Sequence, residues 1–280
     1  MTSVNDKINF LFKNGYCIIE KCLTHKKCDN LKNAIKKLKE KNIKNKYFKN
    51  IDSEHGQDVV RDLVLRDPKN FLQIVDIPKI FKIVKNVLND IFILDNCMAS
   101  NSIKVNNKFS RLVHIDSHLA SKLNFNTSDV VVSLCLDDFT YANGATRVWP
   151  KSHLSGIRIQ NSKNYKRNIL KQNIVVDAKK GSAIIFLGHT WHQVGKNING
   201  KDRFSILNHY KKWWIKPATD FTKCGIKIYK MLNQNQKQLF GFNSISPIFN
   251  FKKQTRQLKT LRKISDISSQ SYLKAKSNNV

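Results

Sequence analysis

Apolar residues in the first third of the chain recur mainly at intervals of three and four, the spacing of one helix face. Asn14-Gly15 interrupts this pattern as a turn signal, and Thr24 stands where a helix N-cap would. The predicted elements are a short helix and then a strand (16–19) within 5–22, a helix over 24–39, a loop over 40–58, a helix or strand over 59–65, and helices over 70–75 and 80–88.

From about residue 92 the pattern changes to short apolar runs separated by turn signals, which is typical of a β-sandwich or barrel. Between two of these runs, residues 156–171 are basic and weakly helical. We interpret them as an insertion across the barrel mouth, where substrate contacts collect. The predicted strands begin with 92–94 and continue as 96–105, 112–117, 130–136, 145–149, 173–176, 183–187 and 203–210.

The length of 280 residues, with 41% hydrophobic and 25% charged residues, fits one globular domain that is mainly β with flanking helices (α+β). We predict this domain over 1–250. It would consist of a helical part (1–90), a β core (91–217) and a C-terminal helical part (218–250), followed by a basic tail (251–280). We interpret the tail as surface-packed rather than as a membrane or nucleic-acid contact.

The formal net charge is +30, and 41 of the 50 basic residues are Lys, spread over the whole chain. Nucleic-acid modules usually concentrate Arg with aromatic residues on one face, so this pattern favours compositional bias over nucleic-acid binding. A surface this positive should still steer anionic substrates. The chain has no long apolar run, no signal-peptide pattern and no CxxC pair among its 6 cysteines. We therefore expect a cytoplasmic protein with reduced thiols and no membrane span, and its oligomeric state is left open.

Two stretches carry candidate chemistry. His114 and Asp116 stand at alternate positions, so in a strand both side chains would point to the same face. His189 and His192 follow a later apolar run and could each supply a third ligand, and the spacing to Arg203 favours His192. Two His and one carboxylate on one face of an octahedron leave positions open, as in non-haem Fe(II) oxygenases.

The open positions suit a 2-oxo dicarboxylate and dioxygen. The far carboxylate of such a cosubstrate needs a cation, and the planar guanidinium of Arg203 could bind it bidentately. Ser205 is two residues further on, so it shares that face and could add a hydroxyl donor. His118 is either a substrate contact or a polar residue at the edge of the site.

These stretches resemble the phytanoyl-CoA dioxygenase family of Fe(II)/2-oxoglutarate oxygenases. The similarity begins at Phe12-Lys13-Asn14-Gly15-Tyr16 and runs to about Pro217. Within it, 136–153 is similar to the family's "ENGxxxxxPGSH" segment. Ala142 stands where the family often has Glu, and Lys151 where it usually has Gly. The other matching pieces are 113–116 and 181–210.

The resemblance implies a double-stranded β-helix (jelly-roll, cupin-like) core. It implies iron held by His114, Asp116 and His192, with 2-oxoglutarate anchored by Arg203. In similar enzymes the Thr146 position also lies near the cosubstrate. An early strand contributes a polar residue there as well, and Asn101 is the candidate.

The resemblance also implies a reaction in which 2-oxoglutarate and O2 yield succinate and carbon dioxide. Halogenating relatives lack the carboxylate, so Asp116 favours hydroxylation or a related oxidation. The substrate is expected to be a small organic or acyl compound. Trp149, Trp191 and Tyr141, with His118, would give a partly aromatic pocket, and basic residues in 156–171 could hold an anionic group. The alternatives are a degenerate binding or regulatory jelly-roll protein and a nucleic-acid-binding protein.

Overall fold

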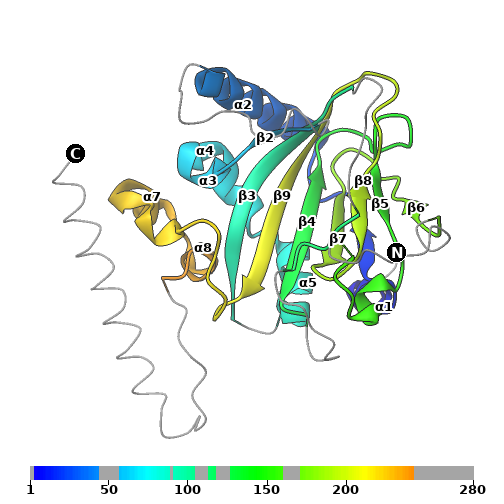
Figure 1. Ribbon diagram of the computed structural model, residues 1–280. Helices are drawn as coiled ribbons and strands as arrows, with labels where there is room; N and C mark the ends of the chain where they lie inside the picture. Colours follow the sequence, from blue (N-terminus) through cyan, green and yellow to red (C-terminus); the bar gives the residue numbers. More distant parts are fainter. Residues whose placement is uncertain are drawn as a thin grey trace, which may run out of the picture.

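The computed structural model describes residues 3–43, 57–88, 91–104, 113–117, 127–159 and 171–242. In these residues two antiparallel sheets form the centre of the molecule, and helices flank the larger one (Figure 1). The larger sheet has six strands in the order β1-β7-β4-β9-β3-β2, and the smaller has three in the order β6-β5-β8. Neighbouring strands are distant in sequence, as in a jelly roll, which confirms the predicted mainly β fold with flanking helices.

The large-sheet strands are β1 (Tyr16–Ile19), β2 (Gln57–Val60), β3 (Phe92–Ser102), β4 (Asp129–Cys135), β7 (Ala183–Leu187) and β9 (Arg203–Lys212). The small-sheet strands are β5 (Thr146–Val148), β6 (Ile174–Val175) and β8 (His192–Val194). The α-helices are α1 (Val4–Asn14), α2 (His25–Ile43), α3 (Leu63–Arg66), α4 (Pro68–Phe71), α5 (Pro78–Leu88), α7 (Gly225–Met231) and α8 (Gln234–Leu239). Short 3₁₀ turns are η2 (Leu72–Ile74), η3 (Ser152–Ser155) and η5 (Phe221–Lys223).

Local signals account for several of these boundaries. Thr24 caps α2, because its Oγ1 accepts a hydrogen bond from the Lys27 N–H at 3.2 Å. The segment 59–65 contains both predicted alternatives, the end of β2 and the start of α3. Helix α2 continues to Ile43, so the loop predicted from residue 40 begins later than expected. The short strand β8 is absent from the sequence prediction, because its three residues adjoin a Gly/Asn-rich turn.

Strand β4 shows how the sequence fills both sides of the large sheet. All its residues are buried, and alternate side chains point to opposite faces. Val130, Val132 and Leu134 join the main core between this sheet and the helices. Val131 and Cys135 join a second core between the two sheets. Burying an apolar side chain of this size stabilises the fold by roughly 1.5–3 kcal/mol, so this mainly apolar, fully buried run suits a central strand.

The longest pairing, between β3 and β9, fixes which residues face the space between the sheets. Ser102 is opposite Arg203, Ser100 is opposite Ser205, and Met98 is opposite Leu207. The register shifts between Leu94 and Asn96, so Asp95 is a β-bulge residue.

A buried ion pair holds this bulge. Lys211 Nζ lies 2.9 Å from Asp95 Oδ1, and both side chains are at most 7% exposed. The same Asp95 oxygen accepts a hydrogen bond from the Ala218 N–H at 2.7 Å. The Asp95 carbonyl accepts another from the Thr219 N–H at 3.0 Å. The pair therefore joins the bulge of β3 to the end of β9 and to the segment that leads to the C-terminal helices.

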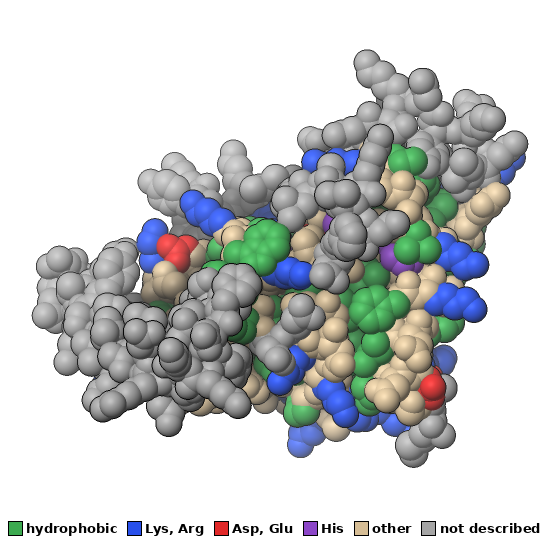
Figure 2. Space-filling model, turned by 90° about the horizontal axis from the view of Figure 1, so that it is seen from below, with side chains coloured by type: hydrophobic (Ala, Val, Ile, Leu, Met, Phe, Trp, Pro, Cys, Tyr) green, Lys and Arg blue, Asp and Glu red, His purple; other side chains and the backbone are tan. Residues whose placement is uncertain are grey.

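Basic side chains are scattered over the face of the molecule shown in Figure 2. They do not gather into one patch among the residues drawn in colour there. In the part of the chain that the structure describes, no helix is both long and apolar enough to cross a membrane.

Replacing Lys211 by Met should lower the free energy of unfolding by about 3–5 kcal/mol, because it leaves the Asp95 carboxylate buried without its cation. Urea unfolding followed by circular dichroism measures this. The matched control is Lys223→Met, which breaks the exposed pair with Asp220 and should cost less than about 1 kcal/mol. Equal effects of the two substitutions would contradict the structural role of the buried pair.

Candidate metal centre and cosubstrate cavity

His114 is positioned by direct backbone pairing with His192. The His114 N–H donates to the His192 carbonyl and the His192 N–H donates to the His114 carbonyl, each at 3.0 Å. This is an isolated antiparallel bridge, and 113–117 do not form the regular strand predicted over 112–117. That strand prediction is wrong for the described residues, because β8, the partner of His114, is itself only three residues long. Leu112 lies outside the described residues. The pairing still brings the two imidazoles together, with ring centroids 4.2 Å apart.

Asp116 is held by the turn that follows β7. The Gly188 carbonyl accepts hydrogen bonds from the Asp116 and Ser117 N–H groups, both at 3.0 Å. The Gly188 N–H in turn donates to the Asp129 carbonyl at 2.9 Å. A Cβ at position 188 would lie 1.8 Å from Asp129 Oδ1, so only glycine allows this close approach.

The three predicted ligands converge. In the described residues, His114, Asp116 and His192 form the group that could hold a metal ion, with one ligand atom from each lying within 4.8 Å of the others. The Asp116 carboxylate oxygens are 3.6 Å from His114 Nε2 and 3.4 Å from His192 Nε2. His189 is not part of this group.

The environment of His192 favours the form that binds a metal. His192 Nδ1 lies 2.9 Å from the Thr190 carbonyl, which can only accept, so Nδ1 carries the proton and Nε2 presents its lone pair. Burial lowers the pKa of His192 to about 4, although the nearby Asp116 acts in the opposite direction. A neutral imidazole and a carboxylate fit a divalent first-row metal. The residues present therefore fit the expected iron.

A cavity of about 150 Å³ lies between the sheets beside these ligands. Arg203, Ser205 and Thr146, the residues predicted to contact the cosubstrate, line this cavity. The complete lining consists of Gln57, Met98, Ser100, His114, Asp116, Val131, Ser133, Thr146, Phe186, His192, Val194, Arg203, Ser205, Leu207 and His209.

Arg203 is the largest fully buried side chain in the described residues, at 2% exposure. Its guanidinium carbon lies 4.0 Å from the centre of the Phe139 ring, a cation–π arrangement that keeps the planar group in place. Ser205 Oγ donates to the Ser100 carbonyl at 3.4 Å. The guanidinium is therefore a fixed positive charge at the wall of the cavity.

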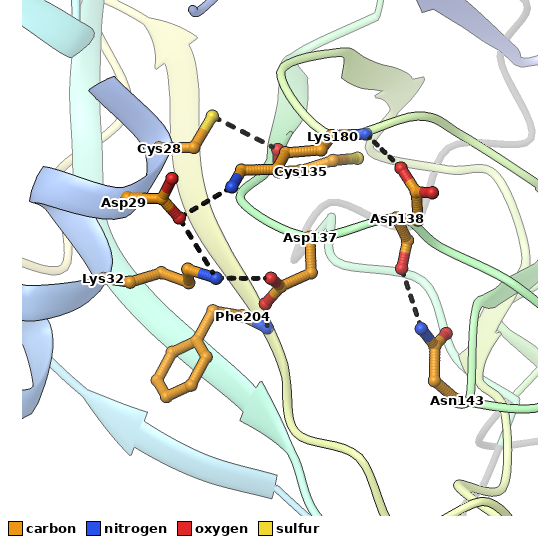
Figure 3. Close-up of polar contacts among 9 residues, drawn as sticks. All are labelled: Cys28, Asp29, Lys32, Cys135, Asp137, Asp138, Asn143, Lys180 and Phe204. Atoms are coloured by element: carbon orange, nitrogen blue, oxygen red, sulfur yellow. Dashed lines mark hydrogen bonds and ion pairs between the residues drawn. The ribbon is translucent and has the colours of Figure 1, made fainter. Parts of the chain in front are cut away.

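A polar network fixes the start of β9 and so the backbone beside Arg203 (Figure 3). Asp137 Oδ2 accepts a hydrogen bond from the Phe204 N–H at 2.9 Å, and Asp137 Oδ1 pairs with Lys32 Nζ at 2.6 Å. Lys180 pairs through its side chain with Asp29 at 2.6 Å and donates its backbone N–H to Asp138 at 2.7 Å. These contacts join α2 to the turn after β4 and to β9.

Asn101, predicted as a cosubstrate residue, does not line the cavity. It pairs in register with Phe204, which belongs to the core on the helical side of the sheet. Successive strand residues face opposite ways, so Asn101 points away from Arg203 and its neighbour Ser100 takes the cavity position. Choosing between the two from the sequence requires the strand register, which the sequence does not specify.

The predicted aromatic pocket is not part of this cavity. Trp149 and Trp191 are buried in a cluster with Ile115, which lies between the candidate ligands His114 and Asp116, so they pack behind the candidate metal site. The Trp191 indole N–H donates to the Ile157 carbonyl at 3.0 Å. Tyr141 is 60% exposed. His118 and most of the predicted insertion, 160–170, lie outside the described residues.

Sequence reasoning missed several cavity residues. Leu207 and His209 share the face of Arg203 and Ser205 on β9, so extending the strand alternation beyond Ser205 would have identified them. Met98 and Ser100 come from β3, and their position depends on the pairing with β9. Gln57 and Phe186 come from distant strands, and no local sequence signal identifies them.

Two His and one carboxylate beside a buried arginine, inside a jelly roll, define the class of mononuclear non-haem metal oxygenases. The chain belongs to the phytanoyl-CoA dioxygenase (PhyH) family, because residues 11–205 match the sequence profile of that family. This confirms the resemblance found in the sequence, and the family is one of Fe/2-oxoglutarate-dependent oxygenases.

Two sequence relatives cover different shares of the chain. "Uncharacterized protein Rv1501" from Mycobacterium tuberculosis (strain ATCC 25618 / H37Rv) is 25% identical over 254 residues, which cover 87% of this chain and 88% of that protein. "Uncharacterized protein YJR154W" from Saccharomyces cerevisiae (strain ATCC 204508 / S288c) is 26% identical over 139 residues, which cover 49% of this chain and 39% of that protein.

Solved structures show the same fold. The epimerase SnoN in complex with Fe3+, alpha ketoglutarate and nogalamycin RO has a TM-score of 0.59 and 16% identity, covering 88% of this chain and 93% of its own. HygX from Streptomyces hygroscopicus, with nickel and 2-oxoglutarate bound, has a TM-score of 0.60 and 11% identity, covering 77% and 89%. Together with the His-Asp-His group, they agree with the expected iron and 2-oxoglutarate.

Replacing His192 by Ala should weaken Fe(II) binding by more than about 100-fold, because loss of a ligand should exceed the effect of losing a hydrogen-bond partner of a ligand. Anaerobic equilibrium dialysis with Fe(II) measures this, with circular dichroism as a check of folding. The matched control is His189→Ala, three residues earlier, which should keep wild-type affinity. Loss of binding in the control with retention in the His192 variant would reverse the ligand assignment.

Proposed function

We propose that the protein is an Fe(II)- and 2-oxoglutarate-dependent dioxygenase that hydroxylates, or otherwise oxidises, a small organic or acyl substrate. The observation that carries this proposal is one cavity that contains both the His114, Asp116 and His192 group and the buried cation of Arg203. A degenerate binding protein would have no need of both features.

Each residue has a separate role in this proposal. His114, Asp116 and His192 hold the iron. Arg203 binds the far carboxylate of 2-oxoglutarate through charge-assisted hydrogen bonds, and Ser205 and Thr146 line the same space. When bound, iron and 2-oxoglutarate supply the oxidising chemistry, in which O2 is consumed and 2-oxoglutarate becomes succinate and carbon dioxide.

The protein's own contribution is orientation and exclusion of water. His192 and Arg203 are almost completely buried, so their interactions with a bound group are strengthened by the low local dielectric constant. Asp116 occupies a ligand position with a carboxylate, which favours oxygenation over halogenation. On the face shown in Figure 2 the basic side chains are scattered, which argues against a nucleic-acid interface on that face.

Oxygen-dependent succinate release tests the reaction class. Purified protein with Fe(II), 2-oxoglutarate and a panel of small metabolites and acyl compounds should release succinate. Asp116→Ala should abolish this release, because it removes a metal ligand. No succinate from any compound, together with no binding of 2-oxoglutarate by calorimetry, would contradict the proposal.

Replacing Arg203 by Lys should raise the dissociation constant for 2-oxoglutarate by about 10- to 100-fold, because Lys cannot make the planar bidentate contact. Calorimetry of the Fe(II)-loaded protein without oxygen measures this. Arg147→Lys is the control. Arg147 follows the cavity residue Thr146 on β5 and stacks against Tyr141, so its substitution should leave the constant unchanged. An equal rise of the dissociation constant in both variants would contradict the assignment of Arg203 as the residue that binds 2-oxoglutarate.

A further inference from the structure

Along the paired strands β3 and β9, the residues that line the cavity become more exposed with distance from Arg203. On β9, the inward-facing Arg203 and Ser205 are at most 3% exposed, whereas Leu207 and His209 are only partly buried. On the paired strand β3, Ser100 is 1% exposed, and Met98 is partly buried. Exposure on both strands therefore increases in the same direction, away from Arg203. On these two strands the His209 end is the more exposed, and we take it as the side from which a substrate approaches.

Two polar atoms near that end are buried and make no hydrogen bond with any described residue. They are Nε2 of His209, which lines the cavity, and Oδ1 of Asn96, which is adjacent to the lining. The two residues are direct cross-strand partners, so their side chains leave the same face of the sheet about 5 Å apart. A buried polar atom without a partner is unfavourable, and each such atom in a native protein calls for an explanation.

The orientation of the Asn96 amide is fixed by its neighbour. Asn96 Nδ2 donates to Asp95 Oδ2 at 3.0 Å, and a carboxylate can only accept in that contact. Asp95 is itself held by Lys211. Asn96 Oδ1 therefore faces away from Asp95. It is a hydrogen-bond acceptor without a donor among the described residues. The bulge at Asp95 thus also determines which atom of the Asn96 amide is available to a ligand.

The cosubstrate does not reach this pair. His209 is six residues beyond Arg203 on one strand, or about 20 Å along it, and 2-oxoglutarate is much shorter than that. His192 packs against Phe186, with ring centroids 4.6 Å apart. Val131 of β4 pairs with Phe186 on one side and with His209 on the other, so the metal group lies toward the His209 end. Asn96 and His209 are thus on the substrate side.

We propose that Asn96 and His209 form a substrate subsite that binds a hydroxyl group, a specificity that rests on the proposed oxygenase function. A hydroxyl can donate to Asn96 Oδ1 and at the same time accept from His209 Nε2–H, which satisfies both atoms. Met98 and Leu207 occupy the adjacent pair of positions and contact the apolar part of the same molecule. The substrate is a small hydroxylated compound with an apolar portion next to the hydroxyl.

Binding to the full chain loaded with Fe(II) and 2-oxoglutarate, without oxygen, tests this inference. The probes are polyols, monosaccharides and hydroxylated acyl compounds, each paired with the analogue that has hydrogen in place of one hydroxyl. We expect at least one hydroxylated probe to bind about tenfold or more tightly than its analogue, because the analogue leaves both protein atoms without a partner.

Asn96→Leu and His209→Leu should each reduce this discrimination to less than about threefold, while Asn86→Leu on the exposed face of α5 should leave it unchanged. Equal affinity of every pair for the wild-type protein, or undiminished discrimination in the Asn96 and His209 variants, would overturn the inference. The wild-type comparison decides even if a variant fails to fold. Because the assay measures binding, absence of turnover would contradict the proposed function and not the subsite.

Discussion

The reciprocal backbone hydrogen bonds between His114 and His192 are the interaction on which the site depends. They connect a short segment, 113–117, to a strand nearly eighty residues later in the chain. Side-chain packing alone would not set the relative position of two imidazoles so closely, whereas a paired backbone does. The Gly188 carbonyl then holds Asp116 by accepting hydrogen bonds from the N–H groups of Asp116 and Ser117. The three candidate ligands thus acquire their geometry from main-chain contacts, and Trp149 and Trp191 pack behind them around Ile115.

The alternation of side chains along β9 organises the rest of the cavity. One face of this strand places the buried Arg203 and Ser205 at one end of the cavity, and the partly buried Leu207 and His209 further along it. The other face contributes Phe204 and Ile206 to the core under the helices. A single strand therefore couples stability to function, because a shift of register by one residue would move Arg203 out of the cavity and place Phe204 there.

Much of this was predictable from the sequence. The candidate ligands His114 and Asp116 could be chosen from their alternate positions, and His192 from its spacing to Arg203, because those signals are local or nearly so. Asn101 was misplaced because its face depends on pairing with β9, which is a long-range property. The prediction that Trp149 and Trp191 line a substrate pocket was wrong for a similar reason. Both side chains are apolar enough to be buried, and composition alone does not distinguish the wall of a pocket from a core. Asn96 and His209 became visible only when the pairing of β3 with β9 was known.

The central claim is that one cavity binds iron through His114, Asp116 and His192 and 2-oxoglutarate through Arg203. Its most direct test is the addition of 2-oxoglutarate to the Fe(II)-loaded protein without oxygen, followed by visible absorption spectroscopy. Chelation of Fe(II) by a 2-oxo acid produces a charge-transfer band. We expect this band to rise to saturation at one equivalent of 2-oxoglutarate per chain. A protein that binds Fe(II) but develops no such band at any concentration of 2-oxoglutarate would contradict the account.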